Sequence, residues 1–152
     1  MTTAYEQLLS RDVLVTREGL ERIHRALEGL GCVPLFSGSK HLRDAESGVR
    51  IAFLVTGDYP GDGKPKPVAF PDPEHACLEK DGIRLIPLVT LVELKLASGM
   101  TSPGRLRDLA DVQDLVRVLR LPREFGGQLD AFVRAKYDEL WLGVRSSEEP
   151  PA

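Results

Sequence analysis

The sequence predicts an α+β domain, in which a small mixed β-sheet with one early helix is followed by a C-terminal cluster of helices. Short apolar runs of strand length lie before Pro87, with one segment of helical periodicity among them. Three longer segments of helical periodicity follow Pro87. Strands first and helices later is the order of an α+β domain, whereas regular alternation would indicate parallel βαβ units.

The composition limits the chain to one domain and to a few function classes. Its 152 residues, 42% of them hydrophobic, suffice for one core, so we expect a single domain over residues 1–145 and a disordered tail over residues 146–152. The net charge of −3 excludes a global basic field for nucleic acid or an acidic membrane. No apolar run approaches the roughly 20 residues that cross a bilayer, and two cysteines without a signal-peptide pattern favour the cytoplasm.

The first half of the chain predicts strands around one helix. DVLV, residues 12–15, has the apolar character of a short strand, and Thr16 is the expected N-cap of a helix that runs to Leu30. Leucine and isoleucine recur on one face of that helix, as expected where a helix packs on a sheet. The remaining extended segments are CVPLF, KHLRD and GVRIAFLVTG, at 32–36, 40–44 and 48–57.

The second half begins with an irregular loop and ends in helices. Five prolines fall within residues 58–75, which forbids regular structure and indicates a pinned loop. DGIRLIPL predicts a further strand at 81–88. Gly99 and Pro122 are the expected stops of the first two helices. The three helices are expected at 88–98, about 103–120 and about 125–142.

One segment carries a family resemblance. LIPLVTLVELKLASGMTSPGRLRDLADVQDLVRVL, residues 85–119, resembles the strand, helix and K-x-A-x(n)-R-x-x-D-x-x-D helix of small nucleotidyltransferase-fold proteins. These include the toxin-type members of bacterial abortive-infection toxin–antitoxin pairs. The resemblance covers roughly residues 10–120. The matching residues are Lys95, Ala97, Arg107, Asp108 and Asp111.

The resemblance implies a metal-dependent transferase. Such proteins use carboxylates and Mg²⁺ to transfer a nucleotidyl group from an NTP to a hydroxyl of RNA, protein or a small molecule. The residues it implies are Asp12 as the catalytic metal ligand, Lys64 and Lys66 as triphosphate contacts, and Lys95, Arg107 and Asp111 as residues that shape the nucleotide site.

Each of these cations also has a structural interpretation. Lys64 and Lys66 could keep a proline-rich loop soluble. Lys95 lies in an apolar helix, so burial beside an acidic partner is the interpretation we favour for it. Arg107 and Asp111 are four residues apart and could form an exposed pair on one helix face.

The carboxylates that nucleotidyl transfer requires are incomplete. The residues two positions from Asp12 are Ser10 and Leu14, and neither carries a carboxylate. In the family, the strand matched by GVRIAFLVTG carries an aspartate where this chain has Ala52. An alternative is therefore a non-catalytic module that holds a nucleotide or a partner without turnover. A sheet edge completed by a second chain would make such a module a homodimer.

The triplet ELK, residues 93–95, suggests a different enzyme class, the metal-dependent nucleases. Glu93 and Lys95 fit the E-x-K half of a metal-dependent nuclease motif, with Asp72 or Asp81 as the acidic partner. That chemistry needs both side chains on one face of a strand. The helical spacing of the surrounding leucines favours a helix, which would separate them.

One short pattern imitates a nucleotidyltransferase turn. Gly38 and Ser39 precede Asp44 and Glu46, like a Gly-Ser turn with an acidic pair. The spacing is too short for that motif, and we expect a hairpin turn from Asp44 onward.

Overall fold

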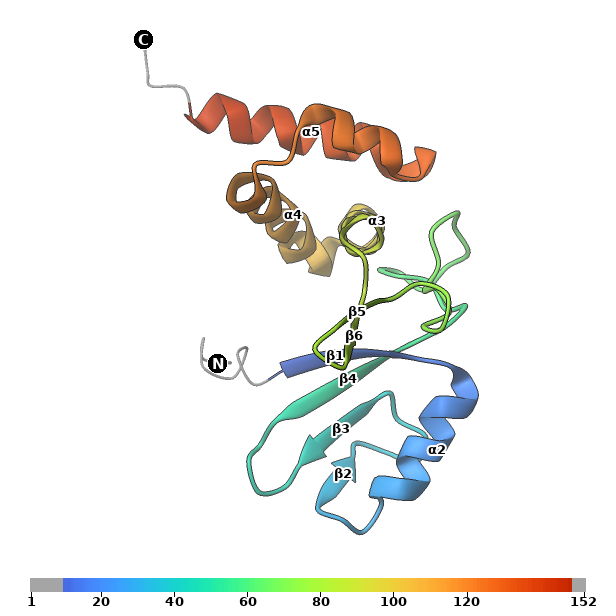
Figure 1. The fold of residues 1–152 in the computed structure, drawn as a ribbon. Coiled ribbons are helices and arrows are strands. Elements are labelled where there is room, and N and C mark those ends of the chain that lie inside the picture. Colours follow the sequence, from blue (N-terminus) through green and yellow to red (C-terminus); the bar gives the residue numbers. More distant parts are fainter. Residues whose placement is uncertain (1–9, 149–152) are drawn as a thin grey trace. The chain divides into compact units, whose positions relative to one another are not determined.

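The computed structural model describes residues 10–148, and it has the mixed α+β composition that the sequence predicts (Figure 1). The chain divides into two compact units. We call residues 1–58 with 70–75 the sheet unit, and residues 59–69 with 76–152 the helical unit. That the two units form one domain stays a prediction.

The sheet unit contains a four-stranded mixed sheet in the order β1-β4-β3-β2. β1 runs parallel to β4, and the other neighbouring pairs are antiparallel. Three of the four strands, β2 to β4, fall within segments that the sequence predicts to be extended, and β1 begins two residues before the predicted strand at 12–15. Their bounds are β1 (Ser10–Val15), β2 (Cys32–Pro34), β3 (His41–Asp44) and β4 (Arg50–Val55).

Helix α2 (Arg17–Leu27) covers one face of this sheet. Thr16 caps it as predicted, because its Oγ1 accepts a hydrogen bond from the amide of Gly19 at 3.0 Å. Apolar residues of α2 pack against a buried cluster from the strands, which consists of Val15, Leu42, Phe53 and Val55. The helix ends three residues before the predicted Leu30, since Gly29 and Gly31 both adopt positive φ and turn the chain.

The proline-rich loop has no regular structure, as predicted. Backbone hydrogen bonds tie its ends together in the sheet unit, where the Gly57 amide donates to Phe70 O and the Phe70 amide donates to Asp58 O, both at 2.9 Å. In the helical unit, Gly61 adopts φ +76° and lies directly against helix α3 (Leu88–Thr101). The prediction of a pinned loop is therefore confirmed.

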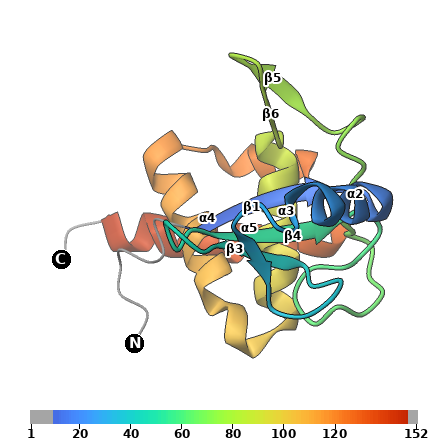
Figure 2. The ribbon, with the colours of Figure 1, turned by 90° about the horizontal axis from the view of Figure 1, so that it is seen from below.

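The helical unit also contains a β-hairpin that the sequence predicts only in part. β5 (Leu78–Lys80) and β6 (Ile83–Leu85) pair antiparallel around Asp81 and Gly82, which both have positive φ. The predicted strand at 81–88 corresponds to β6, and β5 was missed because CLEK has a weak strand pattern. Figure 2 shows the hairpin extending away from the helices, and the side chains of both strands are exposed.

Three packed helices form the core of the helical unit (Figure 1). They are α3, α4 (Leu106–Leu119) and α5 (Ala131–Glu148), with 3-10 turns η1 (Pro103–Arg105) and η2 (Arg123–Gln128) between them. The side chains at the centre of this core are almost fully buried. They are Val92, Leu96, Val112, Val133 and Tyr137.

Two predicted helix boundaries are wrong for physical reasons. Helix α3 continues through Gly99 to Thr101, and Gly99 serves close packing instead of ending the helix. A Cβ at Gly99 would lie 2.6 Å from Leu109 Cδ2 of α4. The third predicted helix, 125–142, is broken at Asp130, whose Oδ1 accepts a hydrogen bond from the Phe132 amide at 2.9 Å and caps α5.

The carboxyl end of α5 overlaps the tail that the sequence predicts at residues 146–152. The helix runs to Glu148, so residues 146–148 are helical where disorder was predicted. The rest of that tail lies outside the described residues. Within residues 10–148, none of the helices combines the length and the apolar character that a membrane span needs.

Candidate functional site

Asp12 and Ala52 lie opposite each other on neighbouring strands. The parallel register of β1 and β4 pairs Asp12 with Ala52, and the antiparallel register of β3 and β4 pairs His41 with the same Ala52. Side chains alternate along a strand, so all three project from the face of the sheet opposite α2. Asp12 and His41 are exposed. The structure thus forms a row of carboxylate, methyl group and imidazole across three strands.

This row does not fit the Mg²⁺ that the family resemblance implies. Nucleotidyl transfer requires two or three carboxylates around the ion and the triphosphate. Among the side chains in the row, Asp12 alone provides one, and imidazole suits zinc or copper better than magnesium. The described residues include no group of three or more His, Cys, Asp or Glu side chains placed to hold a metal ion.

Lys66, predicted to contact triphosphate, holds its own loop together. Its side chain is only 5% exposed. Nζ donates to Asp62 Oδ1 at 2.6 Å, to Pro60 O at 2.7 Å and to Lys64 O at 2.8 Å, so all three of its protons have acceptors. The hydrogen bond from Lys66 is the main cause that holds the pKa of Asp62 below its ordinary value. Lys64 is exposed.

Lys95 and Asp111, also predicted site residues, contact each other between α3 and α4. Lys95 Nζ donates to Asp111 Oδ2 at 2.8 Å and lies 3.5 Å from Asp108 Oδ1. Ser98 Oγ donates to Asp108 Oδ2 at 2.6 Å. Burial alone would lower the pKa of Lys95, but the hydrogen bond and charge of Asp111, with the charge of Asp108, outweigh it and raise that pKa. Lys95 therefore stays protonated, and it has the acidic partner that its favoured interpretation predicted.

Arg105 lies close to Asp108, the aspartate that the sequence analysis matched with Arg107. Its Nη1 lies 3.9 Å from Asp108 Oδ2. Arg105, three residues before Asp108, also matches the R-x-x-D spacing, whereas Arg107 immediately precedes that aspartate. Arg107 lies on α4 with an exposed side chain.

We expect Lys95→Met to lower the free energy of unfolding of the helical unit by about 1–2 kcal/mol, between the values for exposed and buried pairs. The variant leaves Asp108 and Asp111 together without their shared cation. Because the folded pKa of Lys95 is raised, its contribution is complete below the ordinary lysine value of about 10.4 and is lost as the pH rises through the folded value.

Urea denaturation followed by the fluorescence of Trp141, the single tryptophan, measures this effect. Lys136→Met is the matched control, since the ion pair of Lys136 joins it to the exposed Glu139, three residues along the same helix. Equal destabilisation by both substitutions would contradict the structural role of Lys95.

The strand geometry that the nuclease hypothesis needs is not present at Glu93 and Lys95. Residues 93–95 are helical, and Glu93 and Lys95 have different partners. Glu93 Oε1 accepts a hydrogen bond from the Asp130 amide at 2.7 Å, which anchors the start of α5. Its proposed acidic partner Asp81 lies in the hairpin turn.

The Gly-Ser pattern at Gly38 and Ser39 is also structural. Ser39 is fully buried, its Oγ accepts from the His41 amide at 3.1 Å, and its carbonyl is 2.6 Å from His24 Nε2. The Asp44 carboxylate accepts from the amides of Glu46 and Ser47, as expected in the turn between β3 and β4.

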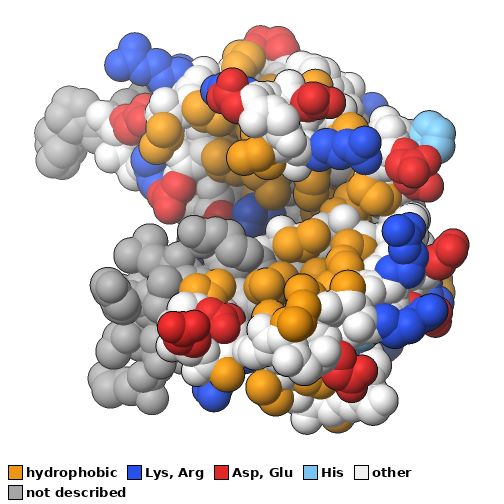
Figure 3. Space-filling view, turned by 60° about the horizontal axis from the view of Figure 1, so that its bottom comes forward, with side chains coloured by type: hydrophobic (Ala, Val, Ile, Leu, Met, Phe, Trp, Pro, Cys, Tyr) orange, Lys and Arg blue, Asp and Glu red, His pale blue; other side chains and the backbone are white. Residues whose placement is uncertain are grey.

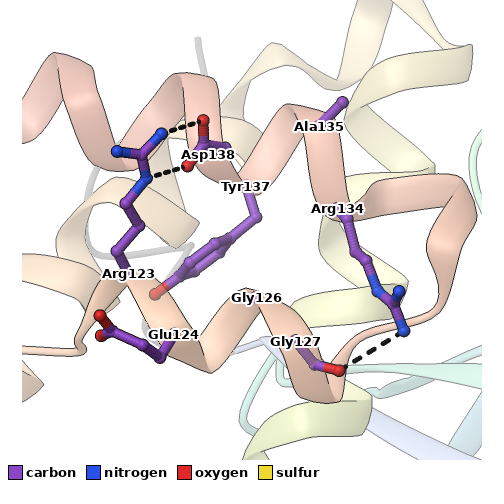
Figure 4. Close-up of a pocket in the computed structure, with 8 residues that line it drawn as sticks. All are labelled: Arg123, Glu124, Gly126, Gly127, Arg134, Ala135, Tyr137 and Asp138. Atoms are coloured by element: carbon purple, nitrogen blue, oxygen red, sulfur yellow. Dashed lines mark hydrogen bonds and ion pairs between the residues drawn. The ribbon is translucent and has the colours of Figure 1, made fainter.

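Sequence reasoning missed a surface pocket of about 450 Å³ at η2 and the start of α5 (Figure 4). Three of its charged side chains have partners: Arg123 donates to both oxygens of Asp138 at 2.5 and 2.9 Å, and Arg134 Nε donates to Leu129 O at 2.8 Å. Tyr137 OH donates to Pro122 O, and burial, with the charge of Glu124, raises its pKa to about 12. These contacts stabilise the turn.

Comparison with known proteins adds no family assignment. The chain matches no protein-family model, no curated protein and no solved structure. The likeness to nucleotidyltransferase-fold proteins therefore rests on the residues quoted from the sequence.

Proposed function

We propose that this chain is a nucleotidyltransferase-like module that binds a nucleotide without transferring it. The observation that carries the proposal is the pairing of Asp12 with Ala52. Where the family resemblance implies a second strand that brings a carboxylate beside the first, this strand brings a methyl group. A single exposed carboxylate leaves the transfer chemistry without the second ligand it requires.

Two of the cations predicted for the nucleotide site support the same conclusion, one a predicted triphosphate contact and the other a residue predicted to shape the site. Lys66 and Lys95 are neutralised by Asp62 and by the pair of Asp108 and Asp111. Neither is available to balance phosphate charge without breaking contacts that hold the loop or the helices. Binding would rely on other groups, and Mg²⁺ would contribute little to it.

A label-transfer assay tests this proposal. The intact 152-residue chain is incubated with the four α-³²P-labelled NTPs, Mg²⁺ and total RNA, and both the RNA and the protein are analysed for label. We expect no incorporation above that of the Asp12→Asn variant. Magnesium-dependent incorporation that Asp12→Asn abolishes would overturn the proposal and establish an active nucleotidyltransferase.

The remaining expectations about partners stay predictions. β1 forms one edge of the described sheet, where a second chain could pair. Light scattering of the intact protein would reveal the homodimer that such pairing produces.

A further inference from the structure

The sheet face opposite α2 carries two arginines in direct opposition. The register of β3 and β4 pairs Arg43 with Arg50. This pair is two residues along each strand from the pairing of His41 with Ala52, and it is therefore the next pair on the same face. Directly opposite side chains in an antiparallel pair have Cβ atoms about 4.5–5.5 Å apart, and like charges there are destabilising. Both arginines are exposed, and neither forms an ion pair or side-chain hydrogen bond with a described residue.

Two other cations of the sheet unit are neutralised nearby. Arg17 and Lys40 share the carboxylate of Asp58, at 3.3 and 2.5 Å. Arg43 and Arg50 have no such acceptor among the described residues. On the face of the molecule seen in Figure 3, Lys and Arg side chains lie in separate small patches near Asp and Glu side chains, and no broad basic surface is seen there.

The neighbouring row on this face has a small side chain at its centre. Ala52 lies two residues after Arg50 on the same strand face, and its side chain ends at Cβ. The exposed ring of His41 lies on one side of Ala52 and the carboxylate of Asp12 on the other. An anion above Ala52 would be attracted toward the two arginines and repelled by Asp12, so the charges set its position.

We propose that Arg43 and Arg50, with His41 beside them, bind a phosphate group without a metal ion. This inference rests on the proposed function and names its ligand chemistry. Guanidinium groups match phosphate oxygens with paired N–H donors, and a phosphate between them converts a repulsive cross-strand pair into an attractive arrangement. The row of Asp12, Ala52 and His41 does not fit a magnesium ion. The two arginines would supply the positive charge that neutralises the phosphate instead.

Thermal unfolding with pyrophosphate in EDTA and low salt tests the site. We expect pyrophosphate to raise the Tm of the intact chain, because it binds the folded state. Arg50→Glu should raise the Tm without ligand, since it creates an opposite-charge pair with Arg43, and should abolish the shift with pyrophosphate. Arg43→Gln, which creates no new charge, should weaken pyrophosphate binding about tenfold by calorimetry.

Two controls sharpen the test. Arg22→Gln changes an exposed arginine on α2 and should leave pyrophosphate binding unchanged. Asp12→Asn removes the repelling carboxylate and should strengthen binding. ATP binding more tightly than pyrophosphate would identify a nucleotide as the source of the phosphate, and equal binding would identify free oligophosphate.

The proposed site is overturned if pyrophosphate does not shift the Tm of the unmodified chain. It is also overturned if the shift persists in both Arg50→Glu and Arg43→Gln. The proposed function fails by a different result, namely magnesium-dependent label transfer. The two failures are therefore distinguishable.

Discussion

Gly61→Ala is expected to lower the free energy of unfolding of the helical unit by about 3 kcal/mol. Gly61 has φ +76°, where an alanine costs about 1–2 kcal/mol. A Cβ there would also overlap α3, lying 2.8 Å from Ser98 O and closer still to Thr101 Oγ1. Overpacking against backbone adds about 1–3 kcal/mol. Urea denaturation followed by Trp141 fluorescence measures the loss.

Gly63→Ala separates the two causes of that loss. Gly63 lies in the same loop with φ +72°, but a Cβ there would have no neighbour within 4 Å. We expect this variant to lose only the conformational part, about 1 kcal/mol. Equal losses for the two variants would show that the loop does not pack on α3 as described.

Ala52→Asp is expected to create a magnesium site beside Asp12. Neighbouring strands lie about 4.8 Å apart, so the new carboxylate would stand beside Asp12 on the same face. Without metal the two carboxylates repel each other and lower the Tm. Mg²⁺ would relieve this repulsion, so its addition should raise the Tm of the variant and leave that of the unmodified chain unchanged.

The double variant Asp12→Asn with Ala52→Asp is the matched control. It keeps the new carboxylate but removes its neighbour, and we expect it to lose the response to Mg²⁺. A magnesium response that survives in the double variant would mean that Asp12 and residue 52 do not form the ligand pair. The register of β1 and β4 would then be wrong.

The fold could be predicted largely because its elements have strong local signals. GVRIAFLVTG contains β4, Thr16 does cap α2, and the apolar spacing of residues 88–98 marks most of α3. Errors arose where a residue's role depends on a distant neighbour. Gly99 looks like a helix stop in the sequence, but the approach of Leu109 from α4 explains why a glycine occupies the helix interior.

The candidate site was harder to predict, because its residues are defined by contacts between segments. Sequence could suggest that Ala52 stands in place of a carboxylate, but only the strand register pairs it with Asp12 and His41. Lys66 has the residue type and the glycine-rich surroundings of a phosphate contact. Its three acceptors come from the conformation of the loop itself, which periodicity does not reveal. The opposition of Arg43 and Arg50 likewise depends on the length of the turn between β3 and β4.

The measurement that tests the central claim most directly is calorimetric titration of the intact 152-residue chain with NTP, in Mg²⁺ and in EDTA. If Ala52 has removed the metal site, NTP affinity will be the same or higher in EDTA, where free triphosphate carries more negative charge. Tight binding that requires Mg²⁺ and is lost in Asp12→Ala would contradict the account, because it would show that a working metal site forms around Asp12 despite Ala52.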